Sequence, residues 1–138
     1  MILLDTSGLL AALDGGQRRH AEAAASLAAA TPPLLLSPFV LAELDHLLAT
    51  HVGGTARSRL LAEVQRGAYQ LQPFSSASVG DARAIIGRYA DLDISLADAS
   101  ICVLATDHGA NEVLTLDERR FRVLTVDTKP LRLLPADA

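Results

Sequence analysis

Short apolar runs that alternate with helical stretches constrain the fold of this chain most strongly. The clearest runs are 2–4, 34–36 and 113–116. A strand that is covered on both faces is apolar almost throughout, whereas a strand with one solvated face alternates apolar and polar residues. Strands of the first kind, separated by helices, are typical of a parallel sheet between two helical layers. We therefore predict an α/β protein, a three-layer α/β/α domain with a mainly parallel central sheet of about five strands.

Helical periodicity, together with Gly, Pro and capping residues, marks six helices. Ser37 can cap one of them, with Pro38 in its first turn. The predicted helices span 7–13, 17–30, 38–50, 55–66, 76–89 and 95–107. A further strand is expected at 123–126, a weaker one at 69–72, and one more at 131–134. No repeat or linker interrupts this order, so we expect residues 1–138 to form a single domain.

Composition narrows the class of protein. Half of the residues are apolar and the mean hydropathy is +0.28, which favours a compact core over a disordered chain. The single cysteine, Cys102, excludes an intrachain disulfide and fits a reducing compartment. Charges interrupt every apolar stretch, and the first residues lack the basic start of a signal peptide. We expect a cytoplasmic protein that does not associate with a membrane.

The charge balance gives two opposing indications about nucleic acid. The formal net charge of −4 argues against nonspecific nucleic-acid binding, and 4% aromatic residues disfavour a platform of stacked rings. However, every basic residue except Lys129 is an arginine, and arginine suits bidentate contacts to phosphate. A compositional bias, also suggested by the many alanines, explains the arginines equally well.

Four carboxylates occupy positions where such a fold would bring them together. Asp5 and Asp117 directly follow predicted strands, and ligands of open α/β sheets bind at the carboxyl ends of strands. Glu43 and Asp98 lie on predicted helices that can pack beside those ends. Clustered carboxylates repel one another by about 4 kcal/mol per pair at 4 Å and an effective dielectric near 20, so a cluster implies a cation or a shared proton. Mg²⁺ and Mn²⁺ take such oxygen ligands.

Each acid also has a purely structural interpretation. Asp5 could cap the helix that follows it, and Asp117 could be a turn or capping residue. Asp98 completes an S-x-x-D capping box, although it also shares a helix face that should be buried. Glu43 and Asp45 border the same apolar stripe from opposite edges, and periodicity alone does not choose between them.

The order and spacing of four motifs resemble those of the PIN domain family, and within it the VapC-type toxin ribonucleases of bacterial toxin–antitoxin pairs. The motifs are Ile2-Leu3-Leu4-Asp5-Thr6-Ser7, Ser37-Pro38 with Leu41-Ala42-Glu43-Leu44, Leu96-Ala97-Asp98-Ala99, and Leu114-Thr115-Leu116-Asp117 with Phe121. The resemblance covers nearly the whole chain. It implies that Asp5, Glu43, Asp98 and Asp117 form a catalytic acidic site, which favours Glu43 over Asp45.

The resemblance also implies a chemistry. Mg²⁺ or Mn²⁺, held mainly by Asp5 and Asp98, would activate a water for attack on a phosphodiester. A hydroxyl from Thr6 or Ser7 would orient that water. Family members often have an acid or a histidine just before the final Phe, where this chain has Arg120. This departure leaves Asp117 as the fourth acid and puts a second metal site in doubt.

The expected partners follow from the same resemblance. The substrate would be a structured cellular RNA, such as a tRNA or a ribosomal RNA loop, because bases splayed from loops are accessible to proteins. A homodimer and a VapB-type antitoxin that covers the site are implied as well. Arg119, Arg120 and Arg122 begin two residues after Asp117, and we expect them to help hold RNA phosphate.

Two other classes of protein share some of these features. A receiver domain of a signalling pair is also a small α/β domain with an acidic Mg²⁺ site, and Lys129-Pro130 matches its C-terminal pair. A receiver, however, needs adjacent acids after its first strand and an aspartate after its third, and residues 46–80 contain no aspartate. The other alternative is a noncatalytic PIN-like module that binds RNA or a protein partner, against which the intact acid set argues.

Overall fold

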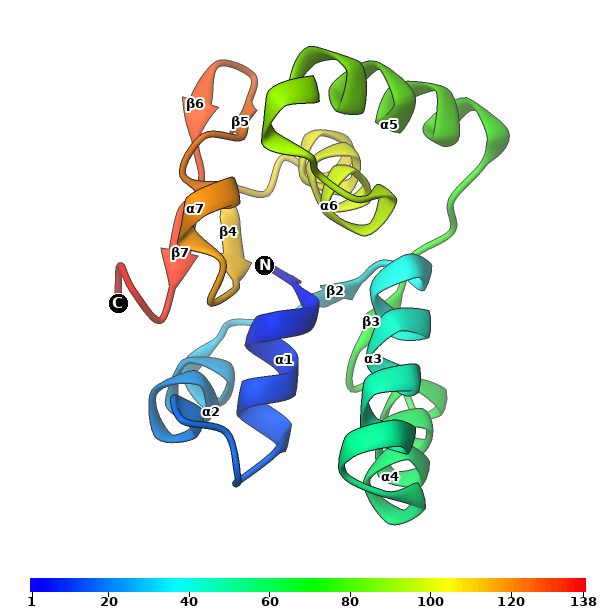
Figure 1. The fold of residues 1–138 in the computed structure, drawn as a ribbon, viewed down its shortest axis with the longest axis vertical. Helices are drawn as coiled ribbons and strands as arrows, with labels where there is room; N and C mark the ends of the chain where they lie inside the picture. Colours follow the sequence, from blue (N-terminus) through cyan, green and yellow to red (C-terminus); the bar gives the residue numbers. More distant parts are fainter.

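A five-stranded parallel sheet lies between two layers of helices in the computed structural model, which describes residues 1–138 (Figure 1). The order of the strands is β3-β2-β1-β4-β7, and every neighbouring pair is parallel. The strands are β1 (Ile2–Leu4), β2 (Leu34–Leu36), β3 (Gln70–Leu71), β4 (Glu112–Leu114) and β7 (Arg132–Leu134). The predicted fold class is therefore confirmed.

The helices cover both faces of the sheet. They are α1 (Thr6–Leu13), α2 (His20–Ala29), α3 (Pro38–His51), α4 (Gly54–Gln65), α5 (Ser76–Arg88), α6 (Leu96–His108) and α7 (Glu118–Phe121), with a 3-10 turn at Ala90–Leu92. Helices α1 and α2 pack together on one face, and α5 and α6 pack together on the other (Figure 1). Helix α3 pairs with α4 and contacts both α1 and α6. Six helices match the predicted ranges closely, whereas α7 was not predicted.

The strand predicted at 123–126 does not join the central sheet. Only Thr125–Val126 (β5) is extended, and it pairs in antiparallel fashion with Lys129–Pro130 (β6) as a separate ribbon. Asp127 and Thr128 adopt positive φ angles of 50° and 63°, which turn the chain back at once, as in a tight hairpin. The predicted strand is therefore confirmed only at Thr125–Val126, and the hairpin turn at Asp127 and Thr128 sets its pairing.

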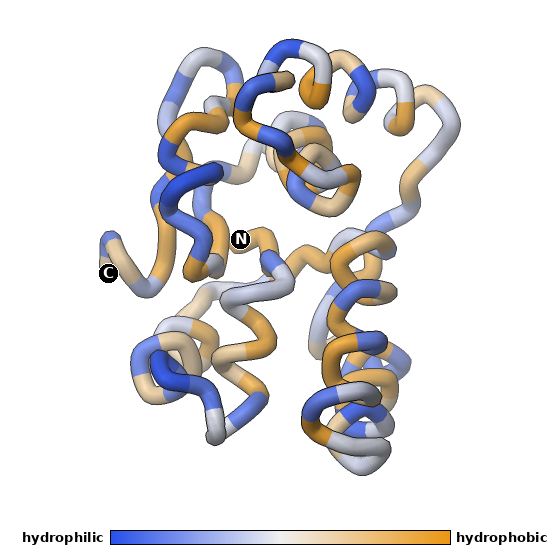
Figure 2. The backbone as a smooth tube through the Cα atoms, viewed as in Figure 1, coloured by the Kyte–Doolittle hydropathy of each residue, from blue (hydrophilic) through white to orange (hydrophobic).

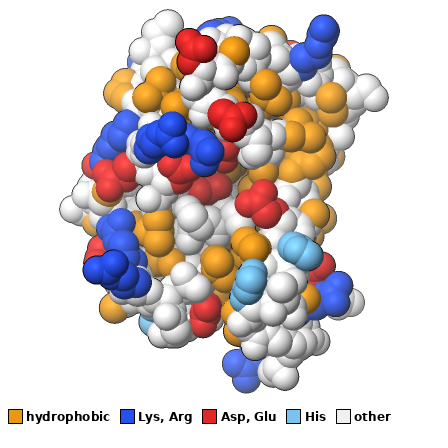
Figure 3. Space-filling model, viewed as in Figure 1, with side chains coloured by type: hydrophobic (Ala, Val, Ile, Leu, Met, Phe, Trp, Pro, Cys, Tyr) orange, Lys and Arg blue, Asp and Glu red, His pale blue; other side chains and the backbone are white.

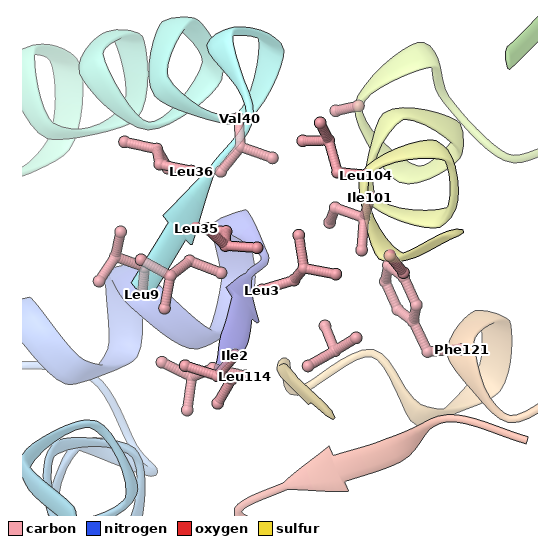
Figure 4. Packing of buried hydrophobic residues seen from close by; sticks show 14 of the residues in the cluster. Ile2, Leu3, Leu9, Leu35, Leu36, Val40, Ile101, Leu104, Leu114 and Phe121 are labelled. Carbon is pink, nitrogen blue, oxygen red and sulfur yellow. The ribbon is translucent and has the colours of Figure 1, made fainter. Parts of the chain in front are cut away.

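The core fills both sides of the sheet because the strands are apolar on both faces. Figure 4 shows Leu3 pointing toward Ile101 and Leu104 of α6, with Leu9 of α1 on the other side of β1. Figure 2 shows the same distribution along the chain, with apolar residues on the central strands and on the helix sides that face them. No helix combines the length and the apolar character that a membrane crossing requires.

The chain reverses its direction of travel across the sheet at β1. It runs outward from β1 through β2 to β3 and then crosses back to β4 on the other side of β1. Ligands of doubly wound sheets bind at such a switch point, outside the carboxyl ends of the strands. Leu4 pairs with Leu114, so Asp5 and Thr115 leave the sheet side by side, and the Asp5 amide donates to the Leu114 carbonyl at 3.0 Å.

Candidate active site

A pocket of about 380 Å³ opens at this switch point and collects all four predicted acids. Its lining residues are Asp5, Thr6, Ser7, Leu10, Glu43, Leu47, Asp93, Ser95, Asp98, Asp117 and Arg120. Figure 3 shows acidic side chains gathered near the centre of one face of the molecule, with cationic side chains directly beside them. Asp45 is not part of the pocket, because it forms an ion pair with Arg57 of α4 at 2.6 Å. The structure thus places Glu43, and not Asp45, beside the other three acids.

Two hydroxyl groups hold the carboxylate of Asp5, which is only 5% exposed. Thr115 Oγ1 donates to Asp5 Oδ2 at 2.6 Å, and Ser7 Oγ donates to the same oxygen at 2.9 Å. Asp5 occupies the N-cap position of α1 but makes no side-chain capping bond, so its capping interpretation was wrong. The carboxylate is oriented toward the end of β4 and the pocket instead.

The same two hydroxyls lock the loops that follow β1 and β4. Thr115 Oγ1 accepts a hydrogen bond from the Asp117 amide at 3.0 Å, and Ser7 Oγ accepts one from the Leu116 amide at 3.0 Å. Sequence reasoning missed Thr115. Its position could have revealed it, because a hydroxyl at the end of a fully buried strand needs a hydrogen-bond partner, and the neighbouring strand ends in a carboxylate.

Gly8 allows this close approach of α1 to β4. A Cβ atom at this position would lie 2.3 Å from the Leu114 carbonyl oxygen and 2.5 Å from its carbon. Any residue other than glycine would push the first turn of α1 away from the strand and separate Ser7 from Thr115. Sequence reasoning gave Gly8 no role, although a glycine inside a helix often marks a close backbone contact.

Burial makes the charge of Asp5 costly. It raises the pKa of Asp5 from 3.8 to about 6; hydrogen bonds from Thr115 and Ser7 oppose the rise, and the nearby charge of Asp98 adds to it. A counter-ion beside Asp5 would therefore offset the cost of burying its charge.

Asp98 has both roles that the sequence suggested for its position. Its Oδ2 accepts a hydrogen bond from the Ser95 amide at 2.9 Å, and Ser95 Oγ accepts one from the Asp98 amide at 3.1 Å, which confirms the capping box. Asp98 also lines the pocket. A short hydrogen bond of 2.6 Å between Ser37 Oγ and Ser100 Oγ ties the start of α3 to α6. This bond links the two helices that carry Glu43 and Asp98.

Asp117 is engaged by Arg120. Its Oδ1 accepts from the Arg120 amide at 3.1 Å, so Asp117 caps α7, and its Oδ2 accepts from Arg120 Nη1 at 3.0 Å. The three arginines of the predicted RNA-binding cluster differ in their partners. Arg120 lines the pocket, Arg119 is exposed, and Arg122 is held by Asp137 at 2.7 Å and by Glu118 at 3.0 Å.

The pocket suits a hard divalent cation that is held by only a few protein ligands. No three His, Cys, Asp or Glu side chains are placed to hold a metal ion together. The donors are all oxygen atoms, however, and Thr6, which lines the pocket, has a buried Oγ1 without a hydrogen-bond partner. Mg²⁺ is commonly bound through one or two carboxylates and keeps several waters, which such a donor set allows.

Comparison with known proteins identifies the family of this chain. The PIN domain family matches residues 2–126. Ribonuclease VapC26 of Mycobacterium tuberculosis is 38% identical over 120 residues, which cover 87% of this chain and 89% of that protein. The crystal structure of VapC20 from the same species, described as a Sarcin-Ricin loop cleaving toxin, has a TM-score of 0.83 at 22% identity and covers 94% of this chain and 100% of that one. A toxin–antitoxin complex from Klebsiella pneumoniae has a TM-score of 0.70 at 22% identity and covers 90% and 92%. The chain belongs to the PIN domain family, and within it to the VapC-type toxin ribonucleases.

Proposed function

We propose that this protein is a metal-dependent endoribonuclease, the toxin of a type II toxin–antitoxin pair, and that it cleaves a structured cellular RNA such as a tRNA or a ribosomal RNA loop. One observation carries the proposal. Asp5 and Asp98, which are distant in sequence, line one pocket at the switch point of the sheet, and burial raises the pKa of Asp5 to about 6. Such an arrangement supports cation binding rather than a merely structural role for the pair.

Asp5 and Asp98 would hold Mg²⁺ or Mn²⁺ in this pocket. The bound ion would supply a water of lowered pKa and offset charge on the phosphodiester. Thr115 and Ser7 fix the orientation of the Asp5 carboxylate. Thr6, whose hydroxyl has no hydrogen-bond partner, would help to orient a water in the pocket, and Glu43, exposed on α3, would accept a hydrogen bond from such a water.

RNA must approach this site in spite of the net charge of −4. Arg119 is exposed, makes no ion pair and directly precedes Arg120 of the pocket, so it is free to contact a phosphate. The open position of the pocket favours a looped or single-stranded segment, whose backbone can bend toward a recessed site, over a rigid duplex.

We further propose a VapB-type antitoxin and a homodimer in the cytoplasm, without membrane association. Relatives that include a toxin–antitoxin complex support the antitoxin. The single buried cysteine, Cys102, whose pKa is raised to about 12 by burial, is compatible with a reducing compartment.

Expression of the protein without a partner tests the proposal. We expect growth arrest and a recurrent RNA cut, mapped from new 5′ ends, and we expect Asp5→Asn and Asp98→Asn to relieve both. In vitro, cleavage should stop with a chelator and return with Mn²⁺.

Helix α3 offers a matched pair of control variants. Glu43→Gln changes an acid of the pocket and should weaken cleavage, whereas Asp45→Asn changes an acid held by Arg57 outside the pocket and should leave cleavage intact. Equal arrest by the wild type and by folded Asp5→Asn and Asp98→Asn variants would refute a catalytic toxin.

A further inference from the structure

Arg120 is a cation inside an acidic pocket. Five carboxylates line that pocket, and Arg120 is the one cationic side chain among its lining residues. The five acids are Asp5, Glu43, Asp93, Asp98 and Asp117. Asp93, at a left-handed backbone position before α6, was not among the acids that the sequence suggested. An excess of negative charge of this size leaves room for more than one cation.

The contacts of Arg120 use both oxygens of one acid. Its backbone amide occupies Asp117 Oδ1 at 3.1 Å, and its Nη1 occupies Asp117 Oδ2 at 3.0 Å. The two side chains are 34% and 24% exposed, so the pair lies in the wall of the pocket and not on the open surface. Each oxygen of Asp117 therefore already accepts one hydrogen bond from Arg120.

The electrostatic attraction on Arg120 is not limited to Asp117. Asp117 raises the pKa of Arg120 most, and the charges of Asp98 and Asp93 raise it further. Arg120 Nε is buried without a hydrogen-bond partner. The guanidinium thus occupies its position because of the surrounding negative charge, although its hydrogen bonds are not all satisfied there.

We infer that Arg120 is a resident cation that competes with divalent ions for Asp117, so that the pocket binds one divalent ion, at Asp5 and Asp98, and Asp117 is not a ligand. The inference rests on the proposed function, since it concerns the same metal site. A divalent ion at Asp117 would have to share the carboxylate with Arg120 and would face the repulsion of a guanidinium that α7 keeps nearby. Asp117 serves as the anchor of Arg120.

Titration calorimetry of the full chain with Mn²⁺ alone tests this inference without a measurement of activity. The wild type should bind one equivalent. Arg120→Gln should bind a second equivalent, or bind the first about tenfold more tightly, because Asp117 becomes available and a positive charge is lost. Arg120→Lys keeps the charge and should still bind one equivalent.

Two controls separate competition at Asp117 from a general change in charge. Arg119→Gln removes the same charge from the exposed residue just before Arg120, and it should bind Mn²⁺ as the wild type does. The double variant Asp117→Asn with Arg120→Gln should lose the additional Mn²⁺ binding that Arg120→Gln alone shows.

The outcomes distinguish this inference from the proposed function. A wild type that binds one ion, with an Arg120→Gln isotherm that superimposes on it, overturns the inference alone. The inference is also overturned if Arg119→Gln increases Mn²⁺ binding as much as Arg120→Gln does. A wild type that binds no Mn²⁺ overturns the proposed function and this inference together.

Discussion

Thr115 Oγ1 donates a hydrogen bond of 2.6 Å to Asp5 Oδ2 across the gap between β4 and β1. The bond is buried, since Thr115 is 1% exposed and Asp5 is 5% exposed. It joins the two strands at which the chain reverses its direction across the sheet. Partners that orient metal-binding carboxylates commonly contribute 10- to 100-fold to metal affinity or activity. Thr115 is accordingly a positioning residue for Asp5.

Replacement of Thr115 should therefore impair the site more than the fold. We expect Thr115→Val to lower RNA cleavage and Mn²⁺ affinity by about 10- to 100-fold, because Asp5 loses its shortest hydrogen bond. Thr115→Ser keeps the hydroxyl and should recover most of both. Thr106→Val is the matched control, because Thr106 Oγ1 bonds only to the Cys102 carbonyl within α6. Wild-type Mn²⁺ affinity in folded Thr115→Val would show that Ser7 alone orients Asp5.

Gly8→Ala should disturb both the fold and the site. The new Cβ would lie 2.3 Å from a backbone oxygen of β4, and neither the strand nor the helix can move without loss of packing. We expect a loss of about 1–3 kcal/mol in the free energy of unfolding, typical of overpacking, together with weaker cleavage.

A second glycine provides the control for that prediction. Gly80 lies in α5 with no atom within 4 Å of its added Cβ, so Gly80→Ala should increase the free energy of unfolding by about 0.5–1 kcal/mol. Denaturant unfolding of both variants measures the difference. Equal stability of the two alanine variants would contradict the close contact at Gly8.

The raised pKa of Asp5 predicts a pH dependence in the metal-free protein. The pKa is about 6 in the folded state and 3.8 in the unfolded state, so the folded state binds the proton more tightly between these values. The free energy of unfolding must then fall as the pH rises from about 4 to about 6. Asp5→Asn cannot ionise and keeps an oxygen that accepts from Thr115. It should exceed the wild type at neutral pH by at most about 3 kcal/mol, and the difference should vanish below about pH 4.

Chelator and metal provide the controls for that experiment. Unfolding curves in chelator should show the advantage of Asp5→Asn, and saturating Mn²⁺ should stabilise the wild type but not the variant. Asp98→Asn is a useful contrast, because Asp98 also caps α6 and its replacement weakens the start of that helix. If the wild type in chelator has the same free energy of unfolding as Asp5→Asn at neutral pH as well as below about pH 4, the burial of an ionised Asp5 is contradicted.

Sequence patterns predicted the sheet and the clustering of acids because both depend on local features. An apolar strand covered on both faces reveals itself by its composition, and an acid directly after such a strand must lie at the edge where the strands end. Glu43 and Asp45 show the limit of this reasoning. They lie two residues apart on α3, and periodicity does not separate them. The resemblance to the PIN family favoured Glu43, and in the structure Asp45 pairs with Arg57 of α4. Contacts between elements that are distant in sequence leave no periodic trace along the chain.

Thr115, Gly8 and Arg120 were not understood from the sequence for the same reason. Each depends on a neighbour that tertiary packing supplies or on the direction of one long side chain. The carboxylate of Asp5 gives Thr115 its role, and the carbonyl of Leu114 gives Gly8 its role. Arg120 was expected to belong to an RNA-binding cluster, but it turns into the pocket toward Asp117.

The remaining arginines of that cluster should differ in what they do. Arg119 is exposed and unpaired, whereas Arg122 is held between Asp137 and Glu118, where Arg122 is also the main reason that the pKa of Asp137 falls to about 2. Arg119→Gln should therefore leave the melting temperature unchanged but weaken binding of an RNA oligonucleotide. The slope of log affinity against log salt should become shallower by the amount expected for about one lost phosphate contact. Arg122→Gln should lower the melting temperature because it releases the C-terminal segment, and it should leave the salt slope unchanged. Fluorescence anisotropy at several salt concentrations, with the catalytically impaired Asp5→Asn background to prevent cleavage, measures both slopes. If Arg122→Gln, and not Arg119→Gln, flattens the salt dependence, the RNA path runs past the C-terminal side of α7 instead of past Arg119.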